Sequence, residues 1–202
     1  RSLPVPNSGV NINRIEVWVV NTQANTMDVR NIIAVTDLGE HPDYMSSNLP
    51  ISQLIDGPQT TITPNRASSN QNNDIFEDLV SNDAVMGFSG ANAAIVEMNM
   101  GFEQGVHYER VGNARKLMPS EFSYNSKLGF ISLRQSLNNA EVLAVAYEYT
   151  LEGNTYQVGT LSQDGYTTGS GENEAMGALV LKMLKSSITQ LDLNNGDPSP
   201  LW

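Results

Sequence analysis

The sequence predicts an α+β fold that is rich in β-structure, with antiparallel, sandwich-like sheets and one or two short helices. The main evidence is the run from Leu128 to Gly159. Within it, large apolar residues alternate with a second set that is small and apolar at first and polar further along the chain. A period of two places the two sets on opposite faces of a sheet. The large set is Leu143, Val145, Tyr147, Tyr149 and Leu151. We therefore expect a hairpin that turns at Glu152-Gly153-Asn154 and buries this heavy face.

The second observation is the alternation in residues 12 to 20, INRIEVWVV. Ile15, Val17 and Val19 fall on one side, and Trp18 falls on the other side with Arg14 and Glu16, which predicts a half-buried strand. An exposed tryptophan can anchor a partner. Trp18 is therefore the candidate interaction residue, and the alternative is that another part of the domain covers it.

The other elements follow from shorter patterns. An amphipathic helix is predicted at residues 74 to 80, where apolar residues recur at i, i+4. Residues 41 to 74 are mostly irregular, and their Asn-rich end is a candidate for mobility. The remaining strand predictions are 32 to 35, 93 to 100, 128 to 134, 141 to 151, 155 to 161 and, in preference to a helix, 177 to 185.

These elements predict one β-rich domain over residues 12 to 190, with an irregular insert at 41 to 107. Residues 1 to 11 and 191 to 202 are predicted to be linkers. The chain begins at Arg1 and ends at Trp202, which suggests a piece of a longer protein or a processed product.

Composition narrows the classes of function. The formal net charge is -11 over 202 residues, which disfavours binding to nucleic acid or to an anionic membrane surface. The chain has no cysteine, so structural disulfides, thiolate catalysis and cysteine-based zinc sites are excluded.

The motifs give little support to catalysis. Gly87-Phe88-Ser89-Gly90 lacks the G-x-S-x-G spacing of a nucleophile elbow, so an ordinary turn is favoured over a Ser89/His107/Asp triad. Neither His41 nor His107 has a neighbouring histidine at metal-ligand spacing. The 22 acidic residues offer no local signature of paired catalytic carboxylates. The chain is therefore predicted not to be an enzyme, and no catalytic or cofactor-binding residue is assigned.

No cofactor or metal is predicted, although Ca²⁺ is a minor alternative. Asp192 to Asp197 resembles part of a calcium loop, but Gly196 stands at position 5 and no closing Glu follows. Gln163-Asp164-Gly165 and Gly171-Glu172 could supply oxygens to a looser site, while solvated turns are the default. Asn113 to Lys116 form a weak basic spot, which we interpret as a solvated surface.

Several stretches, in the same order along the chain, together resemble the SprA/Sov family. The resemblance is strongest over residues 128 to 165. It extends to residues 12 to 21 (INRIEVWVVN), 30 to 40 (RNIIAVTDLGE), 108 to 122 (YERVGNARKLMPSEF), 179 to 185 (LVLKMLK) and the terminal Pro200-Leu201-Trp202. It covers about half of the chain and a small part of the family's full length, and residues 41 to 107 match nothing in it.

The resemblance implies a fragment of a translocon for type IX secretion and gliding motility in Bacteroidetes-type bacteria. In that family a giant single-chain β-barrel conducts folded cargo across the outer membrane, and partner subunits gate or plug it. The implied partners are translocon subunits and secreted cargo, and the implied location is the periplasmic or extracellular side of the outer membrane. Most predicted strands are too short for transmembrane strands of about 9 to 11 residues, so we expect an extramembrane domain. The alternatives are a carbohydrate- or calcium-binding β-sandwich module of a cell-surface protein and a hydrolase within a β scaffold.

Overall fold

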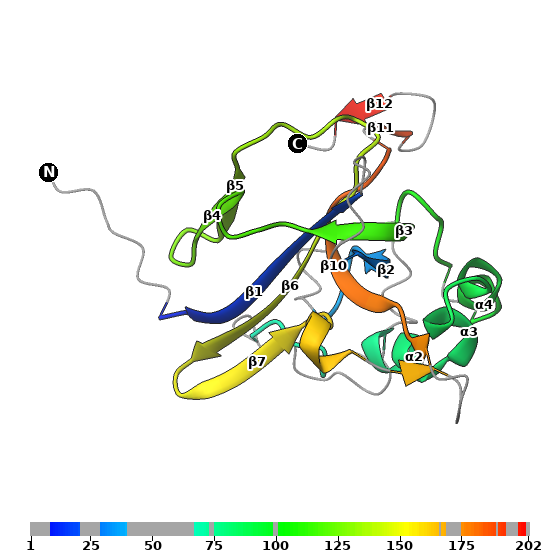
Figure 1. Ribbon diagram of the computed structural model, residues 1–202, viewed down its shortest axis with the longest axis horizontal. Helices are drawn as coiled ribbons and strands as arrows, with labels where there is room; N and C mark the ends of the chain where they lie inside the picture. Colours follow the sequence, from blue (N-terminus) through cyan, green and yellow to red (C-terminus); the bar gives the residue numbers. More distant parts are fainter. Residues whose placement is uncertain are drawn as a thin grey trace, which may run out of the picture.

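A computed structural model describes residues 9–20, 29–39, 67–72, 75–98, 101–165, 167–168, 175–188, 190–192 and 198–200. Its central feature is a six-stranded sheet in the order β1-β3-β2-β10-β6-β7, in which β1 also pairs with β6. This extra pairing closes five strands into a small barrel and leaves β7 attached to the outside of the ring (Figure 1). These strands are β1 (Asn11–Val20), β2 (Val29–Val35), β3 (Tyr108–Lys116), β6 (Leu143–Leu151), β7 (Asn154–Val158) and β10 (Leu179–Lys185).

The β-rich α+β prediction is confirmed, and the sandwich-like arrangement is wrong. Alternation with a period of two fixes which side chains share a face, but it is the same in a sandwich and in a barrel. The barrel forms because β1 pairs with β6 along most of its length and with β3 only at Trp18 to Val20. The sheet is also mixed, since β2 and β10 run parallel over four paired positions, starting at Leu179 and Ile32.

Small and large side chains together fill the barrel interior. Trp18 is the largest of them and lies in register with Ala144 of β6. The interior cluster consists of Trp18, Ile32, Ala34, Val111, Ala114, Val142, Ala144, Ala146, Leu161, Leu179, Leu181 and Met183. The small residues of β6, Ala144 and Ala146, therefore face inward, because the indole and the leucines occupy the remaining space.

The heavy face of β6 consequently lies outside the barrel, contrary to the simple expectation that it forms the main core. Val145 and Tyr149 are buried there, while Leu143, Tyr147 and Leu151 are half-buried. The β6–β7 hairpin itself is as predicted. Its two-residue turn, Glu152-Gly153, has positive φ at both positions, which matches the twist of the flanking strands.

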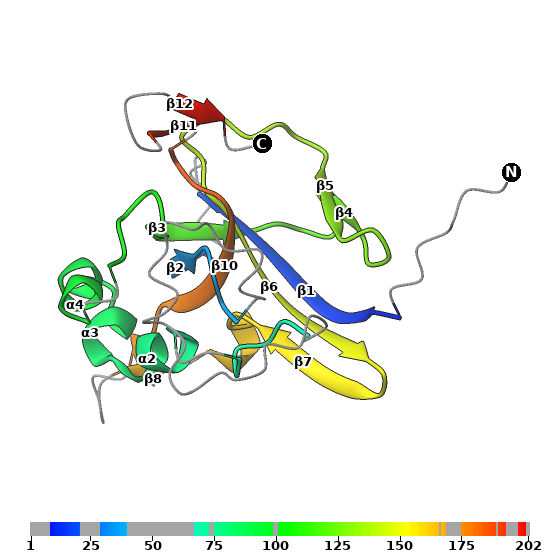
Figure 2. The same cartoon turned by 180° about the vertical axis from the view of Figure 1, so that it is seen from behind.

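Two other structures cover the outside of the barrel. Three short helices, α2 (Ile75–Ser81), α3 (Asp83–Met86) and α4 (Ala91–Glu97), lie together at one side (Figures 1 and 2). They bury Leu79 and Ile95 against the outward residues Ile33 and Val180 of the barrel. A separate hairpin, β4 (Phe122–Asn125) and β5 (Phe130–Leu133), packs Phe122 near Val17 and Val145.

The helix α2 agrees with the prediction for residues 74 to 80, but the strand predicted at 93 to 100 is wrong. Residues Ala91 to Glu97 form α4 instead. Their buried positions are Ala91, Ala94 and Ile95, a spacing of three and four that defines one side of a helix. The alanines there favour the helical backbone intrinsically.

A 3-10 turn and two short strand pairs complete the described chain. The 3-10 turn η2 (Ser162–Asp164) follows β7, and β8 (Thr167–Thr168) pairs with β9 (Ala175–Met176). In the predicted C-terminal linker, β11 (Gln190–Asp192) pairs with β12 (Pro198–Pro200). No helix in the described ranges has the length and apolar character needed to cross a membrane.

Candidate functional site

A network of polar side chains closes one end of the barrel, and Glu16 is at its centre. Glu16 lies on the same side of β1 as Trp18, so its carboxylate points toward the barrel end rather than away from it. It accepts hydrogen bonds from Trp18 Nε1 (3.2 Å), from Ser162 N (2.9 Å) and from Ser162 Oγ (2.6 Å). Lys116 Nζ lies 3.4 Å from the same carboxylate. This half-buried carboxylate is thus compensated by a cation and three donors.

Lys116 connects this carboxylate to the aromatic core. Its ammonium donates to Ser162 Oγ (3.1 Å) and lies 5.8 Å from the centre of the Trp18 ring. Cations over an indole face are attracted by the ring quadrupole at about this separation. Lys116 therefore caps the apolar interior with a charged group while its stem covers Trp18.

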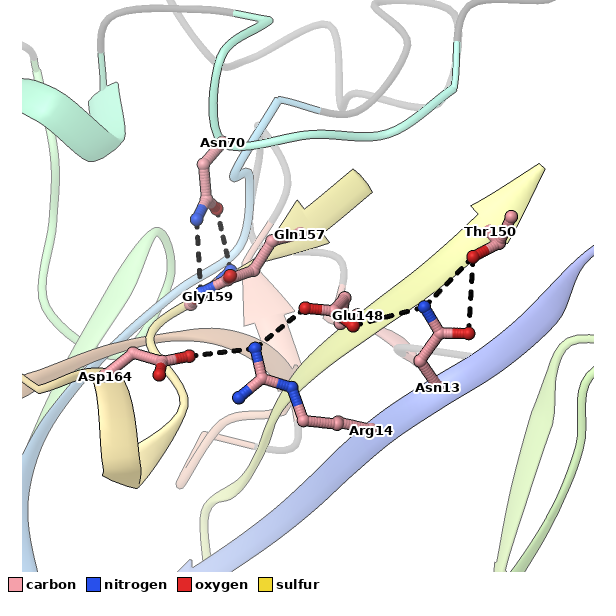
Figure 3. A network of polar contacts seen from close by, with 8 residues as sticks. All are labelled: Asn13, Arg14, Asn70, Glu148, Thr150, Gln157, Gly159 and Asp164. Atoms are coloured by element: carbon pink, nitrogen blue, oxygen red, sulfur yellow. Dashed lines mark hydrogen bonds and ion pairs between the residues drawn. The ribbon is translucent and has the colours of Figure 1, made fainter. Parts of the chain in front are cut away.

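A second part of the network is built on Arg14, also in β1 (Figure 3). One of its guanidinium nitrogens lies 2.7 Å from Glu148 and 3.0 Å from Asp164. The hydrogen bond to Glu148 is the main reason that the pKa of Arg14 is raised, and the same bond lowers the pKa of Glu148. Asn13 adds hydrogen bonds to Glu148 (3.1 Å) and to Thr150 (3.0 Å).

Together these contacts fasten the η2 turn to the barrel at two points. Glu16 holds Ser162 at the start of the turn, and Arg14 holds Asp164 at its end. Leu161, immediately before the turn, is part of the interior cluster. The network therefore holds the η2 turn against this end of the barrel, and we call Arg14, Glu16, Ser162 and Asp164 the latch.

Asn70 makes a comparable attachment beside β7. Its side-chain amide forms two hydrogen bonds with the backbone of Gly159, accepting from the nitrogen (2.7 Å) and donating to the oxygen (3.2 Å) (Figure 3). Its own backbone nitrogen donates to Gln157 O (2.8 Å). The Asn-rich stretch proposed as mobile is therefore bonded to the barrel wall at 67–72, and its part at 73–74 lies outside the described residues.

Two other charged residues, Glu109 and Lys185, lie at the other end of the barrel. Glu109, the second residue of β3, is buried and accepts hydrogen bonds from both the backbone and the hydroxyl of Ser187. Lys185 of β10 donates to the carbonyl oxygens of Asn139, Glu141 and Ser186. Burial lowers the pKa of Lys185. Both groups serve to fix the segments that leave this end.

The grouping of Ser162, Glu16 and Lys116 can be tested as a nucleophile with its base. An activated serine needs a base that is free to take its proton. Glu16 instead also accepts from Trp18 Nε1 and from the Ser162 backbone nitrogen, and Lys116 Nζ lies 3.4 Å from the same carboxylate. These contacts hold the η2 turn in place.

Trp18, the candidate interaction residue, is 1% exposed and lies in the barrel interior. The alternative, that another part of the domain covers it, is what the structure has. The polar side of β1 becomes the inside of the barrel, because strand closure places Arg14 and Glu16 at its end and Trp18 within it. Trp18 is not available to a partner in this structure, and its burial gives no support to an interface role.

The residues considered for a serine triad have other surroundings in the structure. His107 is buried, its Nδ1 accepts from the Glu103 backbone nitrogen (3.0 Å), and its ring lies 6.0 Å from that of Phe102. Burial lowers its pKa. Between α3 and α4 the positive φ belongs to Phe88 (68°) and not to Ser89, in contrast to a strained nucleophile elbow. His41 lies outside the described residues.

Where the structure describes the candidate calcium loops and the basic spot, their charged side chains form ion pairs within the chain. Within the described ranges, no three His, Cys, Asp or Glu residues are grouped so that they could hold a metal ion. Asp164 is bound by Arg14, whereas Gly171-Glu172 and residues 193 to 197 lie outside these ranges. In the basic spot, Arg115 lies 2.8 Å from Glu121 and Lys116 pairs with Glu16, so neither cation is simply solvated.

Comparison with known proteins adds no further identification. No family model matches the chain, and no curated protein matches it. The latch residues were not found by sequence reasoning, since Glu16 and Ser162 are far apart in the chain and neither belongs to a motif. The one available signal was the polar side of β1 itself, where Arg14, Glu16 and Trp18 alternate.

Proposed function

We propose that this chain is a non-enzymatic structural domain of a large outer-membrane translocon of type IX secretion and gliding motility. The observation that carries the proposal is where the SprA/Sov-like stretches fall in the fold. Residues 12–21, 30–40 and 108–122 correspond to β1, β2 and β3, and 179–185 is β10. Residues 128–165 run from the tip of the β4–β5 hairpin through β6 and β7 to η2.

The stretch without resemblance occupies a different part of the molecule. Residues 41 to 107 connect β2 to β3, and their described part contains the helices α2, α3 and α4 outside the barrel. Apart from the terminal Pro200-Leu201-Trp202, the resemblance falls on the closed barrel and its hairpins, as a shared scaffold would produce, since strand closure constrains many residues at once. A connection on the outside can vary without altering the barrel.

The polar networks support a scaffold role rather than a reaction. At both ends of the barrel the charged groups are engaged with partners within the chain, such as Arg14 with Glu148 and Asp164. In the proposed role the domain lies on the periplasmic or extracellular side of the outer membrane. It shapes the translocon there and presents its polar surface to other subunits and to cargo proteins.

The experiment is a tagged full-length parent protein purified from its native membrane, with and without a deletion of residues 9–188. The proposal predicts that the intact parent retains translocon subunits and that the deletion impairs cargo export. Replacing Glu97, which is exposed at the end of α4, by Gln is the matched control and should change neither. An intact parent that retains no translocon subunit, or normal export after the deletion, would falsify the proposal.

A further inference from the structure

The β4–β5 hairpin exposes large apolar side chains at its tip. Tyr124, Leu128 and Phe130 are 46%, 57% and 50% exposed. The base of the hairpin is different, because Phe122 is buried there against the barrel, and Ile131 and Leu133 are half-buried beside it. The hairpin is therefore anchored at one end and apolar at the other, and it projects from the barrel on the side away from α4 (Figures 1 and 2).

The exposed side chains lie on both faces of this hairpin. Tyr124 is paired with Ile131, and Phe130 is paired with Asn125 in the next register position. Neighbouring pairs point to opposite faces of a two-stranded ladder, so Tyr124 and Phe130 project in opposite directions. A flat protein surface could cover only one of them, whereas a medium that surrounds the tip would cover both.

Three backbone N–H groups of the tip are satisfied from within the hairpin. The side-chain oxygen of Asn125 accepts from the nitrogens of Lys127 (3.0 Å) and Leu128 (3.1 Å). The Asn125 backbone oxygen accepts from the nitrogen of Gly129 (2.8 Å). These three donors do not depend on water, which is the condition for placing a turn in an apolar medium.

The charge of the hairpin also differs from that of the rest of the chain. Residues 122 to 140 form the longest run without Asp or Glu, and they include Lys127 and Arg134. The chain as a whole has a formal net charge of -11. A carboxylate is costly to bring near lipid, and a lysine beside aromatic side chains can reach the headgroups while its stem remains with the acyl chains.

From these observations we propose that the tip of the β4–β5 hairpin is a lipid-interface anchor. Tyr124, Leu128 and Phe130 enter the boundary between headgroups and acyl chains of a bilayer, and Lys127 lies among the headgroups. The anchor is shallow, because it consists of one turn, and it orients the barrel relative to the membrane surface. It goes beyond the proposed translocon role and does not require it.

Flotation of the whole chain with phosphatidylcholine vesicles tests this proposal. The unsubstituted chain should float with the vesicles, and the double variant Tyr124→Ser/Phe130→Ser should show about tenfold weaker partitioning, because partitioning scales with buried apolar area. The matched control is Val96→Ser/Met176→Ser, which removes two side chains that are 65% and 63% exposed elsewhere. It should float like the unsubstituted chain. Failure of the unsubstituted chain to float, or equal loss in both double variants, overturns the proposal.

A second measurement locates the contact and remains valid if a double variant folds poorly. The chain has no cysteine, so Leu128→Cys and Val96→Cys can each be labelled at one position with the same polarity-sensitive dye. Vesicles should shift the emission to the blue at position 128 and leave position 96 unchanged. Equal shifts at both positions would assign the effect to the dye and overturn the proposal. Because neither assay contains a translocon subunit, a negative result here leaves the proposed translocon role standing.

Discussion

The barrel interior and the tip of the β4–β5 hairpin place similar aromatic side chains in opposite environments. Trp18 lies on the polar side of its strand and is 1% exposed, whereas Phe130 belongs to an apolar segment and is 50% exposed. The difference arises from closure, since β1 has partners on both edges at Trp18 and the hairpin is a two-stranded ladder by itself. The polarity pattern along a strand thus indicates which side chains share a face. Whether that face is buried depends on how many other elements pack around the strand.

The largest expected difference between the two regions concerns these aromatic residues. Trp18→Ala should lower the free energy of unfolding by about 3 to 5 kcal/mol, because it leaves a cavity in a closed interior. Phe130→Ala should change it by about 0.5 kcal/mol or less, because the site is half exposed. Urea unfolding of both variants measures the contrast, and equal losses would mean that the hairpin is part of the core.

The next contrast uses two glycines with positive φ, Gly159 beside the barrel wall (76°) and Gly129 in the hairpin turn (68°). A β-carbon at Gly159 would lie 3.2 Å from Ala146 Cβ and from Val180 O, while one at Gly129 would meet nothing within 4 Å. Gly159→Ala should therefore cost about 2 to 4 kcal/mol and Gly129→Ala about 1 kcal/mol. Thermal unfolding of the two variants in parallel gives the comparison. Similar melting temperatures would show that backbone strain alone decides the cost.

A smaller contrast separates the half-buried polar network around Glu16 from the exposed hydrogen bonds of the hairpin turn. Glu16→Gln should cost about 2 kcal/mol, because an amide cannot accept all the donors around this position and removes the charge beside Lys116. Asn125→Ala should cost about 0.5 to 1 kcal/mol, since water can replace its turn contacts. Urea unfolding measures both losses, and Glu97→Gln serves as a neutral control on the surface. If Glu16→Gln were as mild as Asn125→Ala, the latch would contribute little to closure.

The smallest effect is a pH dependence from His107 at the start of β3. Burial lowers its pKa below 6.5, so the unfolded chain binds this proton before the folded chain does as the pH falls. Stability from this group is complete above about pH 6.5 and is lost progressively at lower pH, until the pH reaches the folded pKa. His107→Asn, which keeps an acceptor for Glu103 N, should flatten that slope.

Denaturant midpoints between pH 5 and pH 7.5 measure the slope. Phe130→Ala should retain the slope of the unsubstituted chain, since the hairpin contributes no group that titrates in this range. His41 is unchanged in all these variants and cancels in the comparison. A slope that persists in His107→Asn would assign the pH dependence to other groups.

Much of the local structure was predictable from the residues. The alternation in residues 12 to 20 and 143 to 151 predicted β1 and β6, and Glu152-Gly153 predicted the turn to β7. The error at residues 93 to 100 arose because a short run of alternating residues also fits the spacing of a helix. Of the candidate site, the sequence supplied only the polar side of β1. Ser162, Asp164 and Asn70 had no motif, because their roles depend on distant groups that folding brings close.

By itself, therefore, the sequence determined the period of the strands, the β-rich class and the acidic, cysteine-free character of the chain. The tertiary structure alone decided that β1 pairs with β6 and closes the sheet. This pairing set the surroundings of the side chains in and around the barrel. It buried Trp18, turned the alanines of β6 inward and joined Glu16 to Ser162. The physical reason is that side-chain alternation is a local property of the backbone, whereas closure depends on strand register between segments more than a hundred residues apart.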